Sequence, residues 1–208
     1  MNYLEEKDTQ NAEEKGELYR GVGGFFVEII KIFILAIIVI LPIRVFLFQP
    51  FFVQGASMEP NFKDGQYLIV NELGYKETDL KIAKVDSFKE ITRGEVIVFR
   101  YPLNPKQFFI KRIIGLPGER VKVEKGSVFI YNNENPNGFK LKEDYLTKGL
   151  VTKGDNDQPL KDNEYFVMGD NRNHSSDSRT WGPIKSSDVV GRVLLRAWPI
   201  NDVKLFVN

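Results

Sequence analysis

Cysteine is absent from this sequence of 208 residues, and histidine occurs only once. Without cysteine there is no disulfide, cysteine nucleophile, thiolate-bound zinc or iron–sulfur cluster. A single histidine cannot supply the imidazoles of a multi-histidine metal site within one chain. The sequence therefore predicts no cofactor, although the count still allows one Ser–His–Asp triad.

An excess of either charge is also missing, because 29 lysines and arginines face 28 aspartates and glutamates, for a net charge of +1. A nucleic-acid-binding protein needs a basic surface, so we expect no nucleic acid partner. The hydrophobic fraction of 42% and the charged fraction of 27% are those of ordinary globular proteins. These values argue against a disordered chain or a membrane protein with many spans.

Residues 25–47 contain the long apolar run of the chain and follow a polar tail of mixed charge, residues 1–24. A helix needs about 20 apolar residues to cross a bilayer. Glu28 and Lys31 interrupt the run, but they are three residues apart and can pair on one helical face. The run predicts a single N-terminal transmembrane helix that serves as an uncleaved signal anchor.

Two alternatives compete with the anchor. A buried core helix is shorter than this run as a rule. A cleaved secretory signal would have a shorter apolar segment, a basic start and a small-residue cleavage site. Positive charge on the tail side (Lys7, Lys15, Arg20 and Lys31) exceeds that on the far side, where Arg44 is followed by Lys63. The positive-inside rule then predicts a cytoplasmic tail and places residues 48–208 outside the cytoplasm.

Residues 48–208 have the pattern of a mainly β domain. Apolar or alternating stretches bounded by Gly, Pro, Asn and Asp predict strands. These stretches are 95–101, 107–115, 120–133 with a turn at Lys125–Gly126, 164–170 and 189–200. We expect a β-rich, partly barrel-like extracytoplasmic catalytic domain with a β-rich insertion around 119–165.

Ser57 lies among small residues directly after an apolar stretch. A nucleophilic serine needs open space around its hydroxyl and free backbone amides that can stabilise an oxyanion, and small neighbours supply both. A plain turn explains the same residues, because Gly, Ser and Pro are turn formers.

Lys111 lies in a predicted strand, where alternation places it on one face with Phe109 and Ile113. An ordinary lysine, with a pKa of roughly 10.4, is charged at neutral pH and cannot accept a proton. Burial between apolar neighbours lowers that pKa and turns a lysine into a general base. The alternative is a lysine whose stem covers apolar surface while its amine reaches water.

Four segments together resemble the bacterial type I signal peptidases, which are membrane-bound Ser/Lys proteases that remove signal peptides from exported proteins. They occur in the order and spacing of that family. The segments are Gly55–Pro60, Arg93–Phe99, Lys111–Glu119, and Gly169–Arg172 followed by Ser175, Asp177 and Arg179. With the apolar run, the resemblance covers roughly residues 25–200, and it implies a fold of β-domains like that of the self-cleaving repressors.

The resemblance implies Ser57 as the nucleophile and Lys111 as the general base. The supporting residues that it implies are Ser175, which orients the lysine amine, the ion pair of Asp177 and Arg179, the packing residue Met58, and Asp170 and Asn171 in a supporting loop. It further implies that Val53 and Ile110 shape the substrate pockets.

One position departs from part of the family. Some members carry a serine two places before the nucleophile, whose hydroxyl completes the oxyanion hole, and this chain has Gly55 there. The chain is thus similar to the compact members of monoderm bacteria. Oxyanion stabilisation then depends on backbone amides, chiefly that of Ser57.

The reaction that the resemblance implies is acyl transfer through an acyl-enzyme. The expected partners are the lipid bilayer and secretory preproteins that have small residues at the first and third positions before the cut. The sequence gives no indication for or against oligomers. His174 lies between Asp170 and Asp177, so a Ser57–His174–Asp triad is the alternative for the base. Other functions to separate are a self-cleaving repressor relative, which would be soluble, and a membrane-tethered adhesin or assembly factor.

Overall fold

The computed structural model describes residues 24–40, 48–75, 78–79, 84–85 and 89–206. The chain forms two compact units, Met1–Phe46 and Leu47–Asn208. In the first unit, residues 24–40 are helical. Lys31 Nζ lies 2.9 Å from Glu28 Oε1, which confirms the predicted pair.

No helix within the described residues has both the length and the apolar character that a membrane crossing requires. Residues 1–23 and 41–47, which include most of the predicted tail and the end of the predicted anchor, lie outside the described residues. The transmembrane helix over 25–47 therefore stays a prediction.

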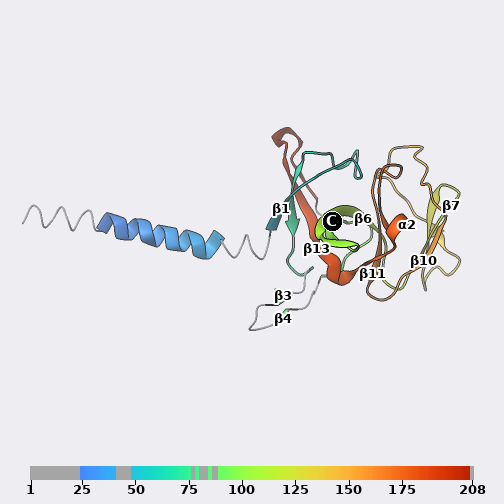
Figure 1. The fold of residues 1–208 in the computed structure, drawn as a ribbon, viewed down its shortest axis with the longest axis horizontal. Coiled ribbons are helices and arrows are strands. Elements are labelled where there is room, and N and C mark those ends of the chain that lie inside the picture. The colour runs from blue at the N-terminus through green and yellow to red at the C-terminus, as the bar shows by residue number, and fades with distance from the viewer. Residues whose placement is uncertain (1–23, 41–47, 76–77, 80–83, 86–88, 207–208) are drawn as a thin grey trace, which may run out of the picture. The chain divides into compact units, whose positions relative to one another are not determined.

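The second unit is built on an eight-stranded antiparallel sheet (Figure 1). Its strand order is β1 (Phe48–Phe52), β2 (Tyr67–Asn71), β13 (Val189–Trp198), β5 (Val96–Tyr101), β6 (Asn104–Gly115), β11 (Glu164–Met168) and β12 (Ile184–Lys185), with β14 (Lys204–Leu205) beside β13. Among the described strands no pairing joins β1 to β12, so the pairings form an open path. The barrel-like closure stays a prediction.

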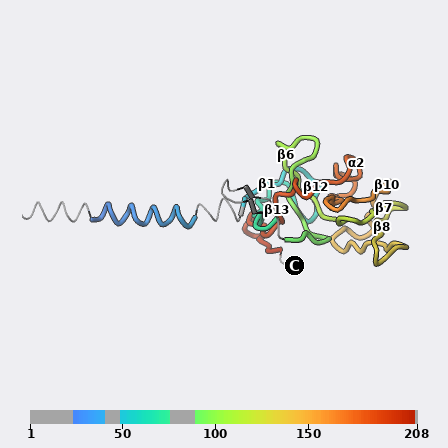
Figure 2. Tube along the Cα trace, turned by 90° about the horizontal axis from the view of Figure 1, so that it is seen from below, coloured from blue at the N-terminus to red at the C-terminus, as the bar shows by residue number. Residues whose placement is uncertain are grey.

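A second, four-stranded antiparallel sheet lies between β6 and β11 in chain order, and its strands lie together at one end of the unit (Figure 2). Its strand order is β10 (Asn156–Pro159), β7 (Arg120–Glu124), β8 (Ser127–Tyr131) and β9 (Phe139–Lys140). Lys125 and Gly126 join β7 to β8 with φ of 48° and 79°. Positive φ at both positions is the geometry of a type I′ turn, which confirms the predicted hairpin.

Short elements complete the second unit. They are the pair β3 (Thr78–Asp79) and β4 (Lys84–Val85), the helix α2 (Ser178–Trp181), and the 3₁₀ turns η2 (Ser186–Asp188) and η3 (Ile200–Asp202). The mainly β prediction is confirmed, as are the strands expected near 95–101, 107–115, 164–170 and 189–200. Strands β1 and β2 were not predicted.

The two sheets share a core. One buried cluster joins Ile114, Phe166 and Met168 of the large sheet to Val121 and Ile130 of the small sheet. Two further clusters belong to the large sheet and pack on β5 and β6. These clusters hold β6, the strand that carries Lys111, in a fixed position.

Candidate active site

Ser57 lies in the loop between β1 and β2, and the loop is fixed at both ends. At the start of the loop, Val53 N donates to Gln66 O, and Gly65 N donates to Val53 O. On the other side of the serine, Phe62 N donates to Met58 O. Met58 is 1% exposed and belongs to the core cluster of the large sheet. The core therefore anchors the residue next to the serine.

Lys111 extends from β6 to the serine. Its Nζ lies 2.8 Å from Ser57 Oγ and 2.9 Å from Ile110 O. The residue is only 4% exposed. Burial lowers the pKa of the amine to about 8, while the Asp177 and Asp170 carboxylates act in the opposite direction. A lysine in this state is neutral in a large fraction of molecules near pH 8, which a proton acceptor requires.

A loop after β11 closes over the serine, and Gly169 allows the close approach. A Cβ at Gly169 would lie 2.4 Å from Ser57 O and 2.3 Å from Ser175 Oγ. Only glycine fits between those two atoms. Asn171 then holds the serine segment through two hydrogen bonds, from its N to Ser57 O at 3.0 Å and from its Nδ2 to Ala56 O at 3.1 Å.

The Ser175 hydroxyl is buried in this loop. Its Oγ has no hydrogen-bond partner among the described residues, so no hydrogen bond joins it to the Lys111 amine in this state of the protein. A neutral amine has two N–H donors and one lone pair. If the lone pair of Lys111 Nζ faces the Ser57 hydroxyl, as a proton acceptor requires, one N–H donates to Ile110 O and the other N–H is left for another acceptor.

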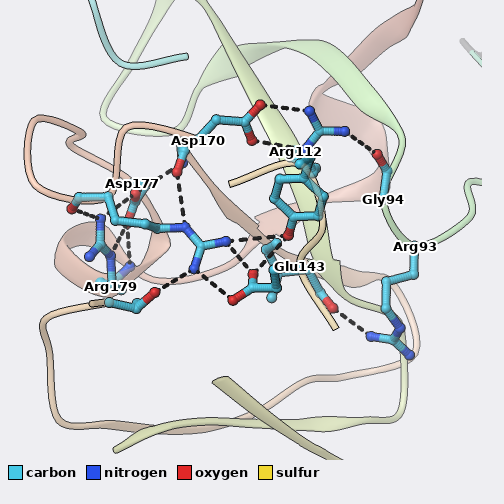
Figure 3. A network of polar contacts seen from close by, with 12 residues as sticks. Arg93, Gly94, Arg112, Glu143, Asp170, Asp177 and Arg179 are labelled. Carbon is cyan, nitrogen blue, oxygen red and sulfur yellow. Dashed lines mark hydrogen bonds and ion pairs between the residues drawn. The ribbon is translucent and has the colours of Figure 1, made fainter. Parts of the chain in front are cut away.

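Two ion pairs hold the carboxylates near the lysine (Figure 3). Arg179 contacts Asp177 with two nitrogens, each 2.8 Å from a carboxylate oxygen. Arg112 contacts Asp170 in the same bidentate way, at 2.8 and 2.6 Å, and also donates to Gly94 O. Asp177 and Asp170 are 0% and 1% exposed, so each needs such a partner.

An apolar cleft of about 570 Å³ opens beside the serine and the lysine. Val53 and Ile110 both line it, together with Phe51, Phe108 and Leu68. A cleft with mostly apolar walls and a few polar groups at one side is typical of a ligand-binding site.

No hydrogen bond between described residues joins the His174 side chain to Ser57 or Lys111. The His174 side chain is exposed, whereas the neighbour of Ser57 Oγ is the Lys111 amine. Within the described residues, no group of three or more His, Asp or Glu side chains is placed to hold a metal ion.

Sequence reasoning missed several residues of the site's surroundings. Arg112, Asn61 and Arg172 each make polar contacts to the loop after β11 or to its neighbours. Arg112 and Arg172 stood inside recognised segments, and two arginines in otherwise apolar or turn-rich stretches were the available signal. Asn61 offered none, because an asparagine after a proline is an ordinary turn residue.

A serine hydroxyl beside a buried, partly neutral lysine amine, at the wall of an apolar cleft, is the arrangement that a serine hydrolase with an amine base requires. Residues 26–198 match the family profile of signal peptidase, peptidase S26. A probable signal peptidase I-2 of Synechocystis sp. is 34% identical over 190 residues, which are 88% of this chain and 78% of that protein.

Signal peptidase IB of Staphylococcus aureus strain MRSA252 is 29% identical over 184 residues, 83% of this chain and 90% of its own length. A crystal structure of a signal peptidase I from Enterococcus faecalis V583 is 33% identical, with a TM-score of 0.43, covering 51% of this chain and 99% of that chain. On the family profile and the Synechocystis relative, the chain belongs to the signal peptidase family S26 and is an enzyme of the type I class.

Proposed function

We propose that this protein is a membrane-bound endopeptidase that cleaves N-terminal signal peptides from secretory preproteins, with Ser57 as the nucleophile and Lys111 as the general base. The observation that carries the proposal is the distance of 2.8 Å between Lys111 Nζ and Ser57 Oγ. A base must lie within hydrogen-bond reach of the proton that it removes, and this distance meets that condition.

Acylation follows from this geometry. Neutral Lys111 accepts the Ser57 hydroxyl proton as Oγ attacks the carbonyl carbon of the scissile bond. Lys111 then gives the proton to the leaving amine, the C–N bond breaks, and the mature protein departs. An ester between the signal peptide and Ser57 remains. In the second half, Lys111 removes a proton from water, which attacks the ester and restores the hydroxyl.

Backbone amides stabilise the oxyanion in this proposal. Gly55 has no side chain, and its own amide is already used, because it donates to Asp64 Oδ1 at 2.7 Å. Among the hydrogen bonds between described residues, none has the Ser57 amide as donor, so that amide is available. One preorganised amide typically contributes about 10²–10³ in rate.

The remaining residues support the pair. Ser175 orients the amine once it is neutral. The pair Asp170–Arg112 fixes the loop after β11 against β6, and the pair Asp177–Arg179 holds that loop internally. Asn171 holds the serine segment through hydrogen bonds, and Met58 holds it by packing into the core. Val53 and Ile110 limit the size of the substrate side chains, so that small residues precede the cut at the first and third positions.

The membrane provides the substrate in this proposal. Residues 25–47 anchor the enzyme as a single-pass protein of the cell membrane, with the N-terminus in the cytoplasm and the catalytic domain outside. The apolar segment of a signal peptide lies in the same bilayer. Confinement to one surface raises the effective concentration of the substrate and sets the height of the cut.

A precursor-cleavage assay tests the proposal. The full-length protein, reconstituted in lipid vesicles, is incubated with an exported precursor, and mass spectrometry identifies the bond that is cut. Lys111→Ala should lose nearly all activity, because it removes the amine. Lys111→Arg should also lose it, because a guanidinium cannot be deprotonated. Ser57→Ala should be inactive. His174→Ala should keep most of the activity.

Circular dichroism of each variant shows whether it is folded. Activity that survives Lys111→Ala but is lost in a folded His174→Ala variant would identify a Ser–His mechanism and overturn the proposal. Folded wild-type protein that leaves the precursor intact would favour a binding role instead.

A further inference from the structure

Tyr145 makes four separate contacts near the site, although it lies between β9 and β10 and belongs to none of the recognised segments. Its ring lies under the Arg112 guanidinium, at 4.1 Å from the ring centroid to the Arg112 Cζ. Its hydroxyl donates to Glu143 Oε1 at 2.8 Å and accepts from Arg172 Nη2 at 3.3 Å. Its carbonyl oxygen accepts from Asn61 Nδ2, also at 2.8 Å.

These contacts reach the segments that carry the reacting groups. Arg112 directly follows Lys111 in β6. Asn61 is four residues beyond Ser57, in the same loop. The third segment is the loop after β11, which is reached through Arg172: Arg172 donates to the Tyr145 hydroxyl and pairs with Glu143, and its Nε donates to Gly169 O. Tyr145 thus joins the nucleophile loop, the base strand and the covering loop.

Asp170 is the point at which the contacts meet. It accepts two hydrogen bonds from Arg112 and one from Asn61 Nδ2, at 2.8 Å. The Arg112 side chain is 12% exposed and Asp170 is fully buried, so the pair is protected from water. The Tyr145 ring covers one face of the guanidinium, and an aromatic face attracts a desolvated cation.

The charged groups around Lys111 are the Asp170 and Asp177 carboxylates and their partners Arg112, Arg179 and, on the loop, Arg172. Loss of the Tyr145 ring would loosen Arg112 and admit water. A less well neutralised Asp170 carboxylate favours the ammonium form of Lys111, because it attracts the positive charge more strongly. The pKa of the base therefore rises.

We propose that Tyr145 is a positioning residue for the Ser57–Lys111 pair, whose ring holds Arg112 against Asp170. The proposal rests on the catalytic roles proposed for Ser57 and Lys111. Tyr145 is not among the residues that line the cleft, so its effect acts on the base and not on substrate binding. Burial and Glu143 raise the pKa of the Tyr145 hydroxyl, so it stays protonated and does not titrate during alkaline assays.

The test compares aromatic and aliphatic residues at position 145. Tyr145→Leu and Tyr145→Met remove the aromatic face, and methionine adapts to irregular spaces. Tyr145→Phe keeps the face and removes the hydroxyl. Val128→Ala is the matched control, because Val128 is buried in the core cluster against which Tyr145 packs, at the small sheet. For each, kcat and KM on a precursor peptide are measured as a function of pH, with a thermal unfolding curve.

The aliphatic variants should shift the midpoint of the pH–activity curve upward by about half a pH unit, which lowers kcat at pH 7 about threefold, with KM unchanged. Tyr145→Phe should keep the wild-type midpoint of the pH–activity curve. Val128→Ala should be less stable but keep the midpoint.

If the pH–activity curves of the aliphatic variants superimpose on the wild-type curve once each is scaled to its own maximum, Tyr145 has a structural role only. Aliphatic variants that are both unfolded at the assay temperature would lead to the same conclusion and overturn the proposal. The catalytic assignment is tested separately, because a folded and active Lys111→Ala variant would contradict it whatever the Tyr145 variants do.

Discussion

The Lys111 amine experiences two opposing influences on its pKa. Burial disfavours the ammonium form, and the Asp177 and Asp170 carboxylates favour it. Burial is the larger influence, so the pKa falls from 10.5 to about 8. The carboxylates do not reverse this because each is neutralised by its own arginine, Arg179 or Arg112. The chemistry of one residue therefore depends on four charges around it.

This balance predicts the pH dependence of activity. Lys111 must be neutral to accept a proton, so its active form is the deprotonated one, and activity should rise with pH through a midpoint near 8. The measurement is kcat/KM for a precursor peptide, under conditions where the chemical step limits the rate. A profile that stays flat from mildly acid to alkaline pH would contradict Lys111 as the base. Ser57→Ala, inactive throughout, is the control for contaminating proteases.

At the scale of one element, the β1–β2 loop holds Ser57 by means of an unusual backbone position at Gly55. Gly55 has φ of +86°, and a Cβ there would meet no atom within 4 Å. Space is therefore available, but the left-handed backbone strains any side chain by about 1–2 kcal/mol. The hydrogen bond from Gly55 N to Asp64 Oδ1 fixes this backbone, so the backbone cannot shift to relieve the strain of an added side chain.

We expect Gly55→Ala and Gly55→Ser to lose activity alike, because both disturb the backbone that leads to the nucleophile. The measurement is kcat/KM for each, beside the free energy of unfolding. Gly149→Ala is the matched control, since Gly149 has φ of +79° and open space around it but lies outside the active site. It should lose similar stability and keep full activity. A serine variant clearly more active than the alanine variant would instead indicate that the new hydroxyl reaches the oxyanion.

Across the whole second unit, the small sheet is part of the structure that supports the site. Its core cluster includes Ile114, Phe166 and Met168 of the large sheet. β6 continues from Lys111 to its last residue, Gly115, and Gly115 packs directly against residues of the small sheet. A Cβ at Gly115 would lie 2.3 Å from Val121 Cγ2 and 2.7 Å from Leu160 Cδ1. The segment 143–145, which follows β9, returns to contact Arg112 and Arg172.

Gly115→Ala should therefore destabilise the whole unit by about 1–3 kcal/mol through overpacking where the two sheets meet. Chemical denaturation measures the loss. Val121→Ala removes the nearest clashing methyl group, so the double variant should be more stable than the sum of the two single effects. Strict additivity of the two changes would show that the sheets do not press against each other at this point.

The sequence by itself determined what depends on neighbouring residues. Alternating apolar residues give strands, a Lys125–Gly126 pair gives a tight turn, and charges three apart in a helix form the Glu28–Lys31 pair. It also singled out Ser57 and Lys111 as candidates. It missed β1 because Pro50 argues against a strand, and a proline is tolerated here only because β1 lies at the edge of the sheet.

The tertiary structure alone decided how distant residues act on one another. Ser57 and Lys111 are 54 residues apart in the chain, yet their side chains lie 2.8 Å apart. The lowered pKa of Lys111, the tight fit of Gly169 against Ser57 and the link from Tyr145 to Arg112 depend on which segments pack together. The strand pattern around Lys111 predicted its burial, but desolvation and close contact are properties of the folded environment, so the size of the pKa shift and the contacts between distant segments depend on the tertiary structure.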